Sequence, residues 1–124
     1  MNGKNEPVAI ILDYIDCINA GDSKKLVTLQ TEDFAFTDMG GSIYIGRDGW
    51  EGYFNDYPEY KIHVKHILMS GDGVAIVGTT TGSHVESKYE EKETVLWVAE
   101  VKGGLVASWR IYSNLEEVKK RLEQ

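Results

Sequence analysis

The sequence predicts an α+β fold in which a strongly bent antiparallel sheet wraps around a long N-terminal helix. Three observations predict this fold: helical spacing of apolar residues before position 21, alternation with a period of two between positions 59 and 112, and turn residues between the alternating segments. The 124 residues have the length of one domain, so we expect a single domain over 1–124. A bent sheet around a helix would enclose a conical cavity.

The first helix is expected to begin at Pro7 and to end before Gly21. Proline suits the first turn of a helix, and a glycine in "NAGD" can take the left-handed conformation that closes it. At about 100° per residue, Asp13 and Asp16 fall on a solvated face, opposite one wide apolar arc that includes Tyr14. The apolar arc contains Val8, Ile10, Ile11, Tyr14, Ile15, Cys17 and Ile18.

A short second helix, "KKLVTLQ", is expected next, with Asp22 or Ser23 as its cap. The strand that follows contains "FAFTDMGG", in which Phe34, Phe36 and Asp38 share one face because side chains alternate. An ionised carboxylate is expensive to bury. Asp38 is therefore exposed at the end of the strand, paired, or kept for chemistry that benefits from a raised pKa. After the glycine turn, "SIYI" predicts a short strand.

The segment from Arg47 to Tyr57 predicts a third helix, which Pro58 ends. Large rings recur along it at the spacing of one helix face. They are Trp50, Tyr53, Phe54 and Tyr57. Such a stripe is typical of a helix that packs on a sheet. Four rings on a helix that also contains Gly49 and Gly52 equally suit the wall of a ligand cavity or a lid, so both interpretations stand.

From residue 59 onward the pattern predicts four long strands in an antiparallel meander. The strands are "EYKIHVKHILM", "VAIVGTTTGSHV", "ETVLWVAEV" and "LVASWRIY", separated by a "SGDG" turn, a charged "ESKYEEK" loop and a "KGG" turn. The last segment, "NLEEVKKRLEQ", has Asn114 as a helix cap and Glu117 three residues later, which predicts a closing helix.

Composition excludes several classes of partner. The net charge of -7 disfavours nucleic acid, which is bound through clustered Lys and Arg. Cys17 is the only cysteine, so neither an intramolecular disulfide nor a thiolate metal site can form. The N-terminus lacks the apolar stretch of a signal peptide, and "VAIIL" is too short to span a membrane. We expect a cytoplasmic protein with no membrane partner.

The order of elements resembles the NTF2-like superfamily, the α+β cone shared by ketosteroid isomerase, SnoaL-type polyketide cyclases, scytalone dehydratase and limonene epoxide hydrolase. The segment "YIDCINAGDSKKLVTLQTEDFAFTDMGGSIYIGRDGWEGYF" is similar to the front half of ketosteroid isomerase. Tyr14 stands seven residues before Gly21, and Asp38 seventeen after it. The resemblance implies that Asp38 is the base that shuttles a proton and that Tyr14 donates a hydrogen bond to the enolate oxygen.

The chain departs from these relatives at three places. The position that holds a third, protonated acid in the isomerase falls near Leu96 or Trp97, and a supporting tyrosine is replaced by Phe54. The segment "SWRIYSN" looks like a signature of SnoaL-like and epoxide-hydrolase-like members, but Ile111 follows Arg110 where the hydrolases have an acid. The first two departures leave only the base and one donor of the isomerase, and Ile111 disfavours the epoxide hydrolase branch.

Each candidate residue also has a purely structural interpretation. Asp38 can cap the "MGG" turn, and Tyr14 can be a core tyrosine whose hydroxyl finds any partner. His66 shares a predicted face with Ile62 and is a second acid-base group or a structural histidine. Trp97 is expected to point inward. The predicted substrate-binding residues are Phe36, Trp50, Tyr53, Phe54, Tyr57, His66, Trp97 and Trp109.

Two functional hypotheses follow. The first is an isomerase, lyase or cyclase-like enzyme that removes a proton alpha to a carbonyl, with Asp38 as base and Tyr14 as donor. The alternative is a non-catalytic binder of an apolar ligand, or a dimerising module. The three histidines lack metal-site spacing, so we expect neither metal nor cofactor. The superfamily resemblance implies a homodimer formed through the exposed side of the sheet.

Overall fold

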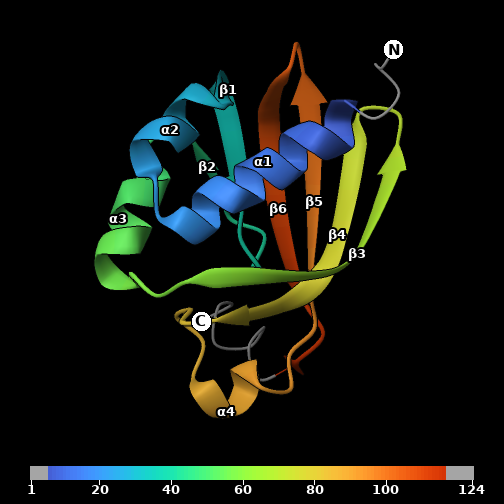
Figure 1. Cartoon of the computed structure of the whole chain (residues 1–124). Helices are drawn as coiled ribbons and strands as arrows, with labels where there is room; N and C mark the ends of the chain where they lie inside the picture. The colour runs from blue at the N-terminus through green and yellow to red at the C-terminus, as the bar shows by residue number, and fades with distance from the viewer. Residues whose placement is uncertain (1–5, 117–124) are drawn as a thin grey trace.

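The computed structural model describes residues 6–116, in which the first three helices lie on one side of a curled sheet (Figure 1). In chain order the elements are α1 (Glu6–Ala20), α2 (Ser23–Thr28), β1 (Gln30–Thr37), β2 (Ile43–Ile45), α3 (Gly49–Asp56), β3 (Lys61–Ser70), β4 (Gly73–Thr81), α4 (Ser87–Glu90), β5 (Val95–Lys102) and β6 (Leu105–Ser113). The predicted α+β class and the predicted order up to β6 are confirmed. The expected closing helix lies outside the described residues, apart from its first few positions.

The six strands lie in the order β2-β1-β6-β5-β4-β3. The predicted meander of β3, β4, β5 and β6 is confirmed, and β1 pairs with β2 in an antiparallel manner. However, β1 and β6 run parallel, so the sheet is not wholly antiparallel. In Figure 1, β3 and β4 bend away from the other strands and pass beneath α1, while α1 contacts β3, β4, β5 and β6. Within the described residues, no helix has the length and apolarity needed to cross a membrane.

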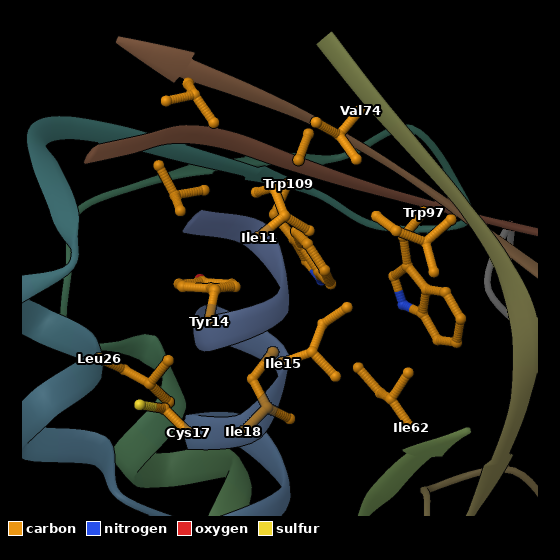
Figure 2. Packing of buried hydrophobic residues seen from close by; sticks show 14 of the residues in the cluster. Ile11, Tyr14, Ile15, Cys17, Ile18, Leu26, Ile62, Val74, Trp97 and Trp109 are labelled. Carbon is orange, nitrogen blue, oxygen red and sulfur yellow. The ribbon is translucent and has the colours of Figure 1, made fainter. Parts of the chain in front are cut away.

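The first helix ends where the sequence predicts. Gly21 has a φ of 66°, its N–H donates to the Ile18 carbonyl at 3.0 Å, and the N–H of Asp22 donates to the Cys17 carbonyl at 3.1 Å. This is the paired arrangement that closes a helix through a left-handed glycine. The predicted apolar arc faces the sheet (Figure 2). Its buried members are Ile11, Tyr14, Ile15, Cys17 and Ile18.

The core lies between α1 and the inward side chains of the sheet. Trp97 and Trp109 project from β5 and β6 toward α1 and stack on each other, with ring centroids 6.4 Å apart (Figure 2). Tyr14 completes the group, 5.1 Å from the Trp109 ring. Aromatic side chains of this size bury the largest apolar areas available to a residue. They therefore anchor α1 to the centre of the sheet.

Local structure differs from the prediction at two helices. The third helix is shorter than Arg47 to Tyr57, because Asp48 at its start makes no side-chain capping bond and two glycines weaken the first turns. Conversely, the predicted charged loop contains α4, whose turn is closed by a hydrogen bond of 2.9 Å from the Glu90 N–H to the Glu86 carbonyl. Its Glu, Lys and Tyr residues permit one helical turn.

A β-bulge in β3 reverses the faces that the sequence predicts. The pairing with β4 shifts between Val64 and His66, so that Ile67 lies opposite the buried Ile76. His66, expected on the inner face, is therefore exposed. A bulge adds one residue to a strand and so moves all later side chains to the other face.

The predicted homodimer stays a prediction. Val64, Leu68 and Tyr112 are large apolar side chains that are exposed in the described part of the chain.

The bulge depends on Gly78, because a Cβ there would lie 2.1 Å from the carbonyl oxygen of His63. We predict that Gly78→Ala lowers the free energy of unfolding by about 2 kcal/mol, since backbone must move to relieve the overlap. Gly52→Ala is the matched control: nothing lies within 4 Å of its Cβ, and a gain of up to about 1 kcal/mol is expected in a helix. Urea denaturation measures both, and an unchanged Gly78→Ala would contradict the packing described.

Candidate functional site

A cavity of about 560 Å³ lies between α3 and the inner side of the sheet. The structure brings seven of the ten predicted site residues to its wall. They are Phe36, Asp38, Trp50, Tyr53, Tyr57, Trp97 and Trp109. Tyr14, Phe54 and His66 do not line it. The size suits a ligand of drug-like dimensions, for which cavities of about 300–1,000 Å³ are usual.

The aromatic stripe of α3 forms one wall of the cavity. Trp50 stacks on Phe54 with ring centroids 5.4 Å apart and an angle of 23°. Phe54 thus lies behind Trp50 and supports it instead of lining the cavity. Tyr53 contacts both Tyr57 at 4.9 Å and Tyr60 at 5.0 Å. The stripe therefore packs against the core, and three of its four rings also line the cavity.

Tyr14 lies in the core with its hydroxyl already occupied. It donates to Oε1 of Gln30 at 2.6 Å and accepts from the indole N–H of Trp50 at 2.8 Å. Burial raises the pKa of Tyr14 above its ordinary value of 10.0, and the Trp50 hydrogen bond offsets part of the shift. A hydroxyl has one proton to donate, and here Gln30 receives it. This geometry supports the structural interpretation of Tyr14, not an oxyanion donor.

Gln30, which the sequence analysis does not single out, links three elements. It lies at the start of β1, is 1% exposed, and donates from its amide nitrogen to the Arg47 carbonyl at 2.8 Å. With Trp50 and Tyr14 it forms a continuous series of hydrogen bonds from α3 through α1 to β1. The sequence signals Gln30 only as a polar residue shortly after α2, at the start of a strand.

Asp38 caps the turn after β1. Its Oδ1 accepts from the N–H groups of Gly40 and Ser42, both at 3.0 Å, and its Oδ2 accepts from the Tyr44 hydroxyl at 3.3 Å. The side chain is half-buried and lines the cavity next to Tyr44. The structure thus shows the turn-capping interpretation of Asp38 and places the same carboxylate at the cavity wall.

Glu93 is a second carboxylate of the cavity wall, and the sequence analysis misses it. It is 2% exposed, and its Oε2 accepts from the Ser113 hydroxyl at 2.6 Å. Its Oε1 is buried and has no hydrogen-bond partner within residues 6–116, and the same holds for Nε1 of Trp97. The signal was the alternation itself, because positions 93, 95 and 97 share one side of an extended segment.

Burial sets the proton affinity of the groups around Glu93. It raises the pKa of Glu93 above its ordinary 4.5; the Ser113 hydrogen bond lowers the pKa again in part, and the charge of Glu90 raises it. Burial likewise raises the pKa of Tyr60, with smaller contributions from Tyr53 and Glu93. The nearby Trp97 side chain lowers the pKa of Tyr60 again in part. This end of the cavity therefore disfavours negative charge.

A polar rim lies beside this buried end. Tyr53 accepts from the backbone N–H of His84 at 3.2 Å, and its hydroxyl lies 3.0 Å from Nδ1 of the same residue. Glu90 accepts from the Thr80 hydroxyl at 3.2 Å and from the Ser83 N–H at 3.0 Å. The Tyr53 bonds hold the loop after β4 against α3, and the Glu90 bonds hold it against α4. No cluster of three or more metal-ligating side chains occurs in the part of the chain that the structure describes.

The fold and the cavity define a protein of the NTF2-like superfamily. A family model described as a SnoaL-like domain matches residues 11–109. The chain therefore belongs to the SnoaL-like family. No curated protein matches the sequence significantly.

Solved structures share the fold at low sequence identity. The epoxide hydrolase/cyclase-like enzyme SalBIII has a TM-score of 0.73 and 21% identity, covering 93% of this chain and 95% of its own. A putative ketosteroid isomerase from Kribbella flavida has a TM-score of 0.70 and 20% identity, covering 90% and 79%. A putative SnoaL-like polyketide cyclase from Jannaschia sp. has a TM-score of 0.73 and 14% identity, covering 96% and 92%. At these identities the likeness establishes the fold alone.

The buried carboxylate predicts a pH-dependent stability. Between pH 4.5 and the raised native pKa, the unfolded chain releases the Glu93 proton while the folded chain keeps it, so stability falls as pH rises. Glu93→Gln should remove this loss, and its advantage over the wild type should grow from pH 4 to pH 7. The gain is about 1.4 kcal/mol for each unit of raised pKa.

Urea unfolding at several pH values measures this difference. Glu91→Gln removes a charge from an exposed side chain two positions away and controls for the change in net charge. If the free energies of unfolding of Glu93→Gln and the wild type differ by the same amount at every pH in this range, Glu93 is not held in the environment described.

Proposed function

We propose that this chain is a small enzyme that moves a proton at the carbon next to a carbonyl group of an apolar small molecule. The observation that supports this function is the cavity, where aromatic rings enclose carboxylates and hydrogen-bond donors. Proton abstraction next to a carbonyl needs a base, a donor for the developing oxyanion and the exclusion of water. Residues of all three kinds line this cavity.

The walls favour an uncharged substrate with one or two rings. Trp50, Tyr53, Tyr57 and Trp109 offer flat apolar surfaces, and ligand cavities are usually apolar with few polar groups. The net charge of -7 disfavours an anion. The polar groups of the lining include those around Asp38 and those around Glu93. A bound ketone could therefore direct its carbonyl group to either of these two regions.

The similar structures support the same class of chemistry. Their names describe an epoxide hydrolase/cyclase-like enzyme, a putative ketosteroid isomerase and a putative polyketide cyclase. The name ketosteroid isomerase specifies a carbonyl compound. This chain is proposed to act on a compound of that class, with isomerase or lyase chemistry.

A non-catalytic binder is the second candidate, and one observation favours it. Both residues that the resemblance assigns to catalysis, Asp38 and Tyr14, form structural hydrogen bonds. A binder would hold an apolar ketone without exchanging its protons. The two candidates therefore differ in a measurable rate, and one ketone can test both.

2-Tetralone is a suitable probe because it has two fused rings, one carbonyl and exchangeable alpha protons. We predict that a concentration ten times the dissociation constant raises the melting temperature by about 4 °C or more. In deuterated water, proton NMR should show exchange of its alpha protons faster with the protein than without it. Binding with no faster exchange would favour the binder, and absence of both would contradict the proposed function.

Two matched substitutions locate the bound ketone. Ile111→Trp adds a ring to a residue that lines the cavity and should abolish the thermal shift and the exchange. Leu12→Trp adds the same ring on the exposed side of α1, where Leu12 is 40% exposed, and should leave both unchanged. Equal behaviour of the two variants would place the ketone outside the cavity.

A further inference from the structure

We infer that the buried end of the cavity is the reaction centre, where Glu93 transfers the proton and the Trp97 N–H holds the carbonyl oxygen. This inference rests on the proposed function. It assigns the base to Glu93, which the ketosteroid isomerase resemblance does not include, and the donor to Trp97, near which that resemblance places a third acid. It is carried by two residues that line the same cavity, each of which has a buried polar atom without a hydrogen-bond partner in the described part of the chain.

The two atoms are unusual because buried polar groups nearly always have partners. Glu93 is 2% exposed and Trp97 is fully buried, so water does not solvate either side chain. Within residues 6–116, neither Oε1 of Glu93 nor Nε1 of Trp97 has a partner. A ligand in the cavity is a natural partner for both, since one atom accepts a proton and the other donates a hydrogen bond.

The backbone holds the two groups in a fixed relation. Trp97 lies within β5, between β4 and β6, and Glu93 precedes the same strand by two residues. Val95 lies between them, faces the same cavity and pairs with Ser113, whose hydroxyl binds the other oxygen of Glu93. One oxygen of Glu93 is therefore fixed to the fold, and the other is left for a substrate.

The contrast with Asp38 favours Glu93 as the base. Both oxygens of Asp38 accept hydrogen bonds from its own turn or from Tyr44, whereas Oε1 of Glu93 accepts none from the described residues. A carboxylate oxygen that already accepts hydrogen bonds is less free to meet a substrate proton. Burial, in addition, raises the pKa of Glu93.

The proposed step is balanced without a cofactor. Oε1 of ionised Glu93 takes the alpha proton, and the C–H electron pair forms a carbon–carbon double bond. The carbonyl π electrons move to the oxygen, which becomes an enolate oxygen that accepts the Trp97 N–H. Glu93 then returns the proton to carbon, so the enzyme ends in its starting state and an isomer or an exchanged substrate is released.

The titratable groups around Glu93 affect its ionisation and so the pH dependence of the exchange rate. Glu90 from α4, Tyr53 from α3 and Tyr60 before β3 interact electrostatically with Glu93. Of these, Glu90 favours the protonated form of Glu93. The wild-type exchange rate should therefore rise with pH as Glu93 ionises, with a midpoint above its ordinary value of 4.5.

Glu93→Gln tests the base directly in the 2-tetralone exchange assay. It keeps the shape of the side chain and should lower the exchange rate at least about 100-fold, while 2-tetralone still raises the melting temperature. Trp97→Phe keeps the stacked ring but removes the N–H, and should lower the rate about 100-fold. Glu91→Gln, on an exposed residue, should exchange at the wild-type rate.

The outcomes separate this inference from the proposed function. Wild-type exchange that persists in Glu93→Gln, or that is lost in Asp38→Asn alone, overturns the inference and leaves the proposed function in place. A wild type that binds 2-tetralone without exchange overturns both. If Glu93→Gln fails to fold, the wild-type pH profile decides, since a rate that does not change above pH 4.5 contradicts Glu93 as the base.

Discussion

The series of hydrogen bonds from Trp50 through Tyr14 and Gln30 to the Arg47 carbonyl is the interaction on which the rest of the site depends. It joins α3, α1 and β1 in the interior, where a polar group without a partner would destabilise the fold. It also orients the Trp50 ring that forms the cavity wall. The tyrosine that the resemblance assigns to catalysis is needed for this architecture.

This constraint divides the polar groups in and behind the cavity wall into two kinds. Tyr14, Gln30 and Asp38 have partners supplied by the protein, and they shape the cavity. Glu93 and Trp97 keep one polar atom each that the described protein does not satisfy. A site that stabilises a developing charge needs groups that are rigidly held yet unoccupied before the substrate arrives. The second kind meets that requirement.

Most of the fold follows from local patterns, because periodicity and turn residues act over a few positions. The closure of α1 at Gly21 and the meander after residue 59 are examples. The bulge near Lys65 was not predictable, since it depends on Gly78 across the sheet. For the same reason the sequence identifies seven cavity-lining residues but not their roles: whether Tyr14 or Glu93 has a partner depends on Gln30 and Ser113, which are distant in sequence.

The orientation of a bound ketone tests the central claim most directly. A crystal structure with 2-tetralone in the cavity should place the carbonyl oxygen at about 3 Å from Nε1 of Trp97 and an alpha carbon beside Oε1 of Glu93. The account is contradicted if the oxygen lies instead at Asp38 and Tyr44, or if the ketone is bound while both Glu93 and Trp97 remain without a partner.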